Sequence, residues 1–191
     1  MTRRIKALVV WAAAAVWVVG AMPQAWAQKV RLATSAGDIV IELDAEKAPK
    51  TVDNFIQYVK AKHYEGTIFH RVIDSFMIQG GGMKADMSEK PTRAPIVLES
   101  RSGLNNVRGS VAMARTAAPN SATSQFFINL SDNVFLDAAT SRDGNGYAVF
   151  GRVVEGMDVV DKIKAVPTAN AGPHQNVPVT PITIRKATVE K

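Results

Sequence analysis

The chain of 191 residues contains no cysteine. This absence excludes disulfide bonds, a CxxC oxidoreductase motif and any zinc site built on thiolates. A protein of this length can bury a sufficient hydrophobic core without disulfides, even when it is secreted. The glycine-punctuated apolar segments at residues 69–81 and 109–129 also lack a carboxylate pair, a cluster of metal ligands and a nucleophile–base pair. They therefore suit a reaction in which no covalent bond is broken.

The chain also lacks an apolar run long enough for a typical membrane-spanning helix. The run at residues 7–22 is 16 residues long, whereas a span needs about 20. Arg3, Arg4 and Lys6 precede this run, and Ala25–Ala27 follows it with a small-x-small pattern. A basic start, an apolar centre and a small-x-small cleavage site are typical of a secretory signal peptide. We expect residues 1–27 to be removed, with an uncleaved membrane anchor as the alternative.

The expected leader also accounts for part of the positive charge. Residues 1–27 hold three basic and no acidic side chains, so cleavage lowers the formal net charge from +6 to +3. The Arg-Arg pair is compatible with twin-arginine export, but Lys6 and the very apolar run favour the general secretory route to the periplasm. Residues 28–191 carry no clustered Lys/Arg stripe, so we expect no nucleic-acid partner. We also expect no stable membrane insertion after cleavage.

Residues 28–191 are expected to form one mainly β domain, since short apolar or alternating runs follow one another between turn signals. Proline at position 49, followed by apolar residues at helical spacing, predicts a helix there, and a second helix is predicted at residues 157–166. Many short strands and two helices favour an antiparallel barrel or sandwich. Strands are predicted at 30–34, 39–43, 67–73, 76–79, 96–98, 109–114, 125–130, 147–154 and 181–189, with polar loops at 80–95 and 132–146.

Four long motifs carry a resemblance to a known family. They read FHRVIDSFMIQGG at 69–81, GSVAMAR at 109–115, SQFFINL at 124–130 and GYAVFGRVVEGMDVVDKI at 146–163. With them the chain resembles the cyclophilins, the peptidyl-prolyl cis–trans isomerases, over about residues 29–189, and it is most similar to short secreted bacterial members. The resemblance implies an eight-stranded antiparallel β-barrel capped by two α-helices, and an enzyme that uses no cofactor and no metal.

The resemblance also implies the active-site residues. Arg71 is the implied catalytic group, and Gln79 would orient both Arg71 and the substrate. Phe76, Met77, Phe127 and Leu136 would form an apolar pocket for the proline ring, and the backbone at Ala114 and Arg115 would hold the preceding residue. The implied substrate-binding residues are Phe76, Met77, Gln79, Ala114, Arg115, Gln125, Phe127, Phe135, Leu136 and Tyr147.

Strand alternation can be compared with this assignment, because successive side chains point to opposite faces. Met77 and Gln79 are expected to share one face, as are Gln125 and Phe127, while Arg71 is expected to point opposite to His70. The implied chemistry also fits an arginine, since a fixed cation can donate a hydrogen bond to the proline nitrogen when the X-Pro amide is twisted.

Two residues and one short segment allow other interpretations. His70 could transfer a proton, but isomerisation moves none, so we expect a structural role. Ser124 could be a hydrolase nucleophile, but no G-x-S-x-G motif surrounds it. The segment 143–146 faintly resembles a calcium loop but lacks further acidic ligands, so a turn is expected.

The chain departs from animal-type cyclophilins at several implied site positions. Phe135 replaces a tryptophan that meets cyclosporin, Tyr147 replaces a histidine, and Arg115 replaces an asparagine. Residues 83–95 lack the glycine-rich loop of those members. We therefore expect weak cyclosporin binding and leave the preferred residue before proline open.

Taken together, the patterns predict a periplasmic prolyl isomerase whose partners are unfolded or partly folded exported proteins that contain proline. Slow X-Pro isomerisation can limit the folding of such proteins. Two alternatives of the same fold remain: a chaperone that captures proline peptides without turnover, and a secreted effector that binds proteins of another cell. No coiled-coil or repeat pattern is present, so a monomer is expected.

Overall fold

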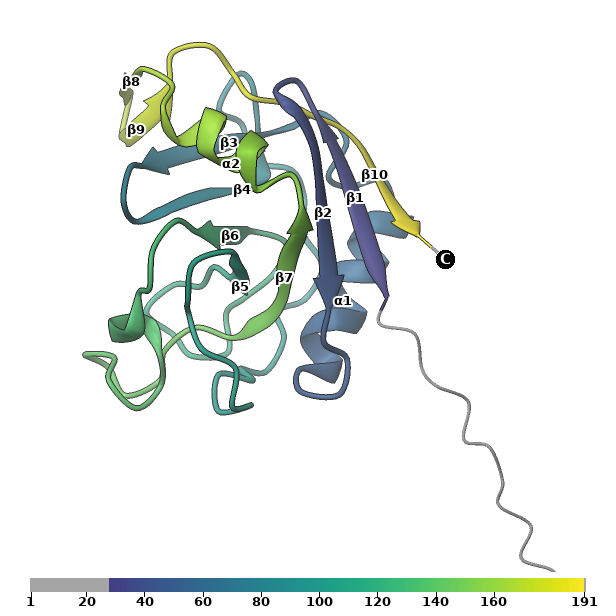
Figure 1. Ribbon diagram of the computed structural model, residues 1–191, viewed down its shortest axis with the longest axis vertical. Coiled ribbons are helices and arrows are strands. Elements are labelled where there is room, and N and C mark those ends of the chain that lie inside the picture. The colour runs from purple at the N-terminus through teal and green to yellow at the C-terminus, as the bar shows by residue number, and fades with distance from the viewer. Residues whose placement is uncertain (1–27, 191) are drawn as a thin grey trace, which may run out of the picture.

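The computed structural model describes residues 28–190 of the chain. A curled antiparallel sheet of eight strands forms the body of the domain, in the order β10-β1-β2-β7-β5-β6-β4-β3 (Figure 1). Its strands are β1 (Lys29–Thr34), β2 (Gly37–Leu43), β3 (Thr67–Ile73), β4 (Met77–Lys84), β5 (Ser110–Met113), β6 (Phe126–Asn129), β7 (Val149–Glu155) and β10 (Ile184–Glu190).

The two ends of this sheet come together through the segment that leads into β10. The backbone N–H of Phe69 in β3 donates to the carbonyl of Ile182 at 2.9 Å, and Ile68 and Thr183 form an isolated antiparallel bridge. Because the first and last strands of the order meet in this way, the sheet curls into a barrel. The mainly β, eight-stranded antiparallel class predicted from the sequence is confirmed.

Two helices accompany the barrel, as predicted. Helix α1 (Pro49–Lys60) begins with proline in its first turn, where the missing N–H costs nothing, and it contacts β10. Helix α2 (Met157–Lys164) contacts β2, β3 and β4. Figure 1 shows α2 near the top of the view and α1 in its lower half. Both helices turn apolar residues inward, among them Phe55 of α1 and Val160 of α2.

The central strands carry apolar side chains on both faces. Ile78 of β4 and Phe126 and Ile128 of β6 belong to the large cluster that fills the barrel. Their neighbours Met77 and Phe127 belong to a second, smaller cluster on the other face. Strand alternation therefore separates a closed core from an outer apolar patch.

The structure corrects the predicted end of β4. Residues 80–82 were expected to open a polar loop, yet β4 runs on through the three glycines to Lys84. Gly81 has φ +89°, and a Cβ there would lie 2.9 Å from the rings of Phe126 and Tyr64. Glycine is needed at this position for its conformation and for close packing, so it does not mark the end of the strand.

Two further differences concern short segments. Residues 96–98 were expected to form a strand, but only one bridge forms, between Ile96 and Ala122. A hairpin that the sequence did not predict, β8 (Thr168–Ala171) and β9 (His174–Pro178), makes a separate two-stranded sheet. Strand β9 packs against β3.

Strand β3 departs from simple alternation. Phe69 pairs with Gly80 and Arg71 pairs with Gln79, so two steps along β3 face one step along β4. This irregularity places Phe69 and Val72, three residues apart, in the same core cluster. The expected opposition of Arg71 and His70 rests on unbroken alternation, which does not hold here.

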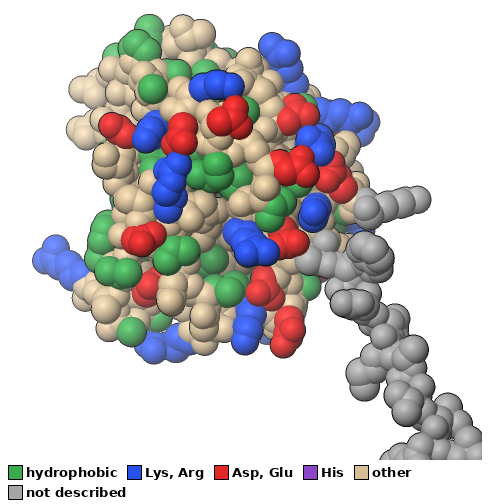
Figure 2. Space-filling view, viewed as in Figure 1, with side chains coloured by type: hydrophobic (Ala, Val, Ile, Leu, Met, Phe, Trp, Pro, Cys, Tyr) green, Lys and Arg blue, Asp and Glu red, His purple; other side chains and the backbone are tan. Residues whose placement is uncertain are grey.

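The outer surface mixes charges of both signs. Figure 2 shows acidic and basic side chains interspersed on one face, with apolar atoms between them. No helix within residues 28–190 is long and apolar enough to cross a membrane. The predicted signal peptide, residues 1–27, lies outside the described residues.

Candidate active site

The candidate site lies on the outer face of four adjacent strands. Across this face the backbone register sets Arg71 of β3 opposite Gln79 of β4, Gln79 opposite Phe127 of β6, and Phe127 opposite Ala112 of β5. Directly opposed residues point to the same side of a sheet. The register therefore puts one cation, one amide and one aromatic ring into a single row.

A small pocket of about 130 Å³ opens over this row. The structure brings nine of the eleven predicted site residues together there, and the other two, Gln125 and Phe135, lie beside it rather than in its wall. The lining residues are Arg71, Phe76, Met77, Gln79, Ala114, Arg115, Phe127, Leu136 and Tyr147.

Gln125 contacts the site through Gln79. The Gln79 Nε2 atom donates to Gln125 Oε1 at 2.9 Å, and a Cβ at Gly82 would lie 2.5 Å from the Gln125 side chain. Gly82 thus leaves the room that Gln125 occupies. Among the described residues the amide of Gln79 is hydrogen-bonded to Gln125 and not to Arg71, and its orienting role stays a prediction.

Phe135 forms part of the rim of the site. Its side chain is 54% exposed and stacks on Phe76, with ring centroids 5.7 Å apart and an interplanar angle of 25°. It lies in a short 3₁₀ helix, Val134–Leu136, within the segment predicted as a loop. Leu136, the next residue, is buried and belongs to the outer apolar cluster.

Arg71 is the free cation of the pocket. Its side chain is half-buried, and among the described residues it pairs with no carboxylate. Arg115, the second arginine, is ion-paired with Asp143. A substrate in the pocket therefore meets one uncompensated guanidinium beside apolar walls.

A buried network of asparagines, which sequence reasoning missed, supports the pocket from behind. Asn129 of β6 donates to Ser110 Oγ at 2.8 Å, and Asn133 Nδ2 donates to Asn129 Oδ1 at 2.7 Å and to the carbonyl of Phe76 at 2.8 Å. Asn106 joins them through its backbone carbonyl, which accepts from the Asn133 N–H at 2.7 Å. The network fixes the backbone of Phe76, yet nothing in the residue spacing signals these partners.

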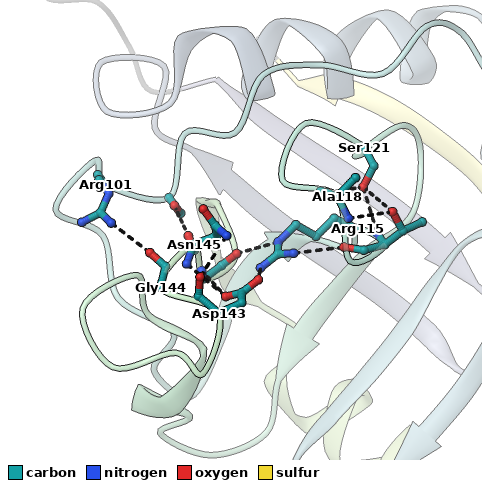
Figure 3. Close-up of polar contacts among 10 residues, drawn as sticks. Arg101, Arg115, Ala118, Ser121, Asp143, Gly144 and Asn145 are labelled. Atoms are coloured by element: carbon teal, nitrogen blue, oxygen red, sulfur yellow. Dashed lines mark hydrogen bonds and ion pairs between the residues drawn. The ribbon is translucent and has the colours of Figure 1, made fainter.

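A cluster of polar contacts borders the other side of the pocket (Figure 3). The Arg115 side chain is only 3% exposed and pairs with Asp143. Its guanidinium carbon lies 4.7 Å from the centre of the Tyr147 ring. The segment 143–146 is a turn, and the Asp143 carboxylate faces an arginine rather than a cation site. No group of three His, Asp or Glu side chains within residues 28–190 is placed to hold a metal.

His70 and Ser124 do not line the pocket. His70 is buried, and this burial, with His174 and Arg71 nearby, lowers its pKa from 6.5 to about 4. Its Nδ1 atom has no hydrogen-bond partner among the described groups. The Ser124 hydroxyl is likewise fully buried and unpartnered there, so neither side chain reaches a bound substrate.

A larger hollow of about 900 Å³ lies between the end of β2 and residues 103–107. Its rim is acidic, with Glu42, Asp44 and Glu46, and its arginine, Arg152, is paired with Glu42 at 2.7 Å. Size alone does not identify a catalytic site. The smaller pocket is the candidate because it joins a free cation to an apolar wall.

Comparison with known proteins bears on this arrangement. The family model described as cyclophilin type peptidyl-prolyl cis-trans isomerase/CLD matches residues 29–189. The chain belongs to this family. A Streptomyces antibioticus isomerase, cyp18, is 58% identical over 161 residues, covering 84% of this chain and 97% of its own. Isomerase A of Dickeya dadantii is 51% identical over the whole of both chains.

The same assignment follows from other relatives and from solved structures. Isomerase B of Escherichia coli K12 is 54% identical over 159 residues, covering 83% of this chain and 97% of its own. A crystal structure of a Cryptosporidium parvum cyclophilin-type isomerase matches with a TM-score of 0.72 and 26% identity, covering 87% of this chain and 99% of that one. The cyclophilin resemblance is confirmed, and the chain is a peptidyl-prolyl cis–trans isomerase.

Proposed function

We propose that this isomerase acts through Arg71 and that its substrates are exported proteins with slow X-Pro bonds. The observation that carries the proposal is the pocket itself, where the uncompensated guanidinium of Arg71 faces the side chains of Met77 and Phe127. Such a pocket can hold the apolar ring of a proline and place the Arg71 guanidinium beside it as a hydrogen-bond donor.

The chemistry requires only that the twisted amide be bound better than the planar one. Rotation about a peptide bond meets a barrier of about 18–20 kcal/mol, because resonance is lost at the twisted state. At that point the proline nitrogen becomes pyramidal and regains a lone pair. An arginine can donate a hydrogen bond to this lone pair. In either planar isomer the lone pair is delocalised by amide resonance, so the nitrogen is a poor acceptor.

The pocket walls supply the orientation. Phe127 and Leu136 are buried within the outer cluster, and Phe76 lies half-buried beside them. A proline ring held against these side chains presents its nitrogen to one side only. A second Cryptosporidium parvum isomerase structure, determined in the presence of the dipeptide Ala-Pro, matches this chain with a TM-score of 0.71. Ala-Pro is therefore a suitable first ligand to test here.

The expected signal peptide supports the cellular part of the proposal. Removal of residues 1–27 through the general secretory route would leave residues 28–191 in the periplasm, where exported chains fold. Mass spectrometry of the protein recovered from a periplasmic extract tests this directly. A mature N-terminus at Gln28 is expected, whereas an intact leader in the membrane fraction would contradict cleavage.

The catalytic part is tested with Arg71→Ala and Arg71→Lys in residues 28–191. Removing one transition-state donor typically lowers turnover by about 100- to 1000-fold, so we expect a loss of this size for Arg71→Ala in a protease-coupled assay on an Xaa-Pro peptide. Arg71→Lys keeps the charge without the planar fork and should recover only part of it. A folded Arg71→Ala protein with the parent kcat/KM would refute this role for Arg71.

A further inference from the structure

Arg115 joins two loops that border the substrate pocket. It follows β5 and uses each of its three guanidinium nitrogens: Nε donates to the carbonyl of Gly146 at 2.8 Å, Nη1 to the carbonyl of Thr116 at 3.0 Å, and Nη2 to Asp143. Figure 3 shows Arg115 lying between these loops. A nearly buried arginine held at three nitrogens has little freedom to turn.

Asp143 is oriented for this contact by its own loop. One of its carboxylate oxygens, Oδ1, accepts from the backbone N–H of Asn145 at 3.0 Å and from that of Gly146 at 3.3 Å. The other, Oδ2, faces Arg115. The Arg115 guanidinium and these backbone donors hold the pKa of Asp143 well below its usual range. The carboxylate therefore stays ionised, and paired with Arg115, in more acid solution than an ordinary aspartate would.

Tyr147 connects this pair to the pocket. Its ring lies under the Arg115 guanidinium at 4.7 Å and meets Phe127 edge-to-face, with ring centroids 5.6 Å apart. The backbone beneath Tyr147 is fixed independently, because its N–H donates to the carbonyl of Leu136 at 2.9 Å. Gly146, just before it, has no room for a Cβ, which would lie 2.5 Å from the Ala138 nitrogen. The backbone is therefore fixed, and the orientation of the Tyr147 ring depends on its contacts with Arg115 and Phe127.

We infer that Asp143 is a positioning residue for the isomerase: it holds Arg115 over Tyr147, and this contact fixes the wall against which the substrate binds. Asp143 touches no substrate itself, since it does not line the pocket. The inference rests on the proposed placement of the substrate at Arg71 and Phe127. The turn at 143–146 would then affect how tightly the peptide binds, and not the rate of rotation about its X-Pro bond.

Asp143→Asn is the decisive substitution, and Asp161→Asn is its matched control. Asparagine keeps an oxygen for the backbone donors of the turn, but it removes the charge and places an NH2 donor where Oδ2 accepts from Arg115. Asp161 also pairs with an arginine, Arg108, at 2.9 Å, but on helix α2 and away from the pocket. A cation–π contact is worth about 0.5–2 kcal/mol, so loss of its alignment predicts a rise in KM of about twofold to thirtyfold.

The expected pattern separates positioning from catalysis and from folding. In Asp143→Asn, KM for an Xaa-Pro peptide rises as stated while kcat changes by less than about twofold. Asp143→Glu, which keeps the charge on a longer side chain, should give an intermediate KM. The Asp161→Asn control should match the parent in both constants. Equal KM in Asp143→Asn and Asp161→Asn, or a fall in kcat alone, would overturn the inference.

A double-mutant cycle with Tyr147→Ala tests the route of the effect. If Asp143 acts through Arg115 on Tyr147, then Asp143→Asn changes KM little once the ring is gone. Additive effects on log KM would show that Asp143 acts elsewhere, and the inference would fail. Arg71→Ala, run alongside, separates the two hypotheses: full activity of that variant would reject the proposed site, whereas its inactivity together with additivity rejects only the role of Asp143. Thermal unfolding of each variant ensures that folded proteins are compared.

Discussion

The two faces of strands β4, β5 and β6 bear similar side chains in different surroundings. On the inner face Phe126 contacts three aromatic rings, those of Phe55, Tyr64 and Phe69, at centroid distances of 5.6, 5.5 and 6.1 Å. On the outer face its neighbour Phe127 contacts one, Tyr147, and borders an open pocket. Alternation along one strand therefore separates residues that hold the fold together from residues available to a ligand.

The two faces also differ in how their polar groups are used. In the inner cluster the polar side-chain atoms are tyrosine hydroxyls with partners inside the domain: that of Tyr64 donates to the carbonyl of Ser124 at 3.0 Å. The outer cluster is small and is bordered by Arg71, Gln79 and Arg115. A filled interior gains stability from close packing, whereas an apolar patch with a polar border can bind a partner that brings its own apolar group.

The largest predicted effects come from removing the two neighbouring rings. Phe126→Ala should lower the free energy of unfolding by about 3–5 kcal/mol, because it empties a closed aromatic site. Phe127→Ala should cost less, about 1–3 kcal/mol, because its space opens on the pocket. Urea unfolding of both proteins measures this difference.

Peptide titration of the same two variants sharpens the comparison. Phe127→Ala should weaken Ala-Pro peptide binding by at least about tenfold, equivalent to about 1.4 kcal/mol, while any folded Phe126→Ala protein should bind as the parent does. Unchanged peptide affinity in folded Phe127→Ala would remove this ring from the binding site.

Much of this arrangement could be predicted from the sequence, because the information is local. The apolar spacing after Pro49 predicted α1, and alternation in 76–79 and 125–130 correctly separated Met77 and Phe127 from the core residues beside them. Most of the predicted site residues came from long motifs; Phe135 and Leu136 lie between two of them. Nine of these residues meet at one pocket. The register of β3, β4 and β6 brings four of them together, and the other five come from the segments beside β4, β5 and β7 and from the 3₁₀ helix.

The rest depends on contacts between distant residues. The glycines at 80–82 looked like a loop, since their need to pack against Tyr64 and Phe126 is invisible locally. The β8–β9 hairpin is largely exposed and has no apolar alternation to reveal it. The pair of Arg115 and Asp143 joins residues 28 positions apart, and no spacing rule connects them.

A second, smaller effect concerns pH and a residue that belongs to neither apolar cluster. Burial lowers the pKa of His70 to about 4, against 6.5 for an exposed histidine. Between these pH values His70 is protonated in the unfolded chain but not in the folded chain. The free energy of unfolding therefore falls as the pH falls from about 6.5 towards 4. We expect His70 to account for a loss of about 2 kcal/mol between pH 7 and pH 5.

His70→Gln should remove this part of the acid sensitivity. The variant is compared with the parent by urea unfolding at pH 7 and pH 5, so that any constant cost of the substitution cancels. His63→Gln is the comparison variant, since burial and Lys90 also lower the pKa of His63, so its loss should remove part of the acid sensitivity too. An equal pH-dependent loss in His70→Gln and the parent would show that His70 is protonated without penalty.

The smallest effect on catalysis is expected at the rim of the outer cluster. Phe135 is more than half exposed and contacts the pocket through Phe76, so Phe135→Trp should change kcat/KM by less than about twofold, as for most surface substitutions. The tryptophans of the chain are Trp11, Trp17 and Trp26, all in the expected leader. In residues 28–191 the new indole is thus the single tryptophan, and its fluorescence reports peptide binding directly.

The same substitution tests how closely this rim matches that of animal-type cyclophilins, in which the resemblance implies a tryptophan that meets cyclosporin. A phenyl ring has no N–H to donate, so the parent should be inhibited weakly. One regained hydrogen bond is worth about 0.5–1.5 kcal/mol and should strengthen inhibition of Phe135→Trp by about twofold to tenfold. Activity titrated with cyclosporin on both proteins measures the gain. Tight inhibition of the parent, or no gain in the variant, would show that the 3₁₀ segment at Val134–Leu136 meets the drug differently, although Leu136 still lines the pocket beneath it.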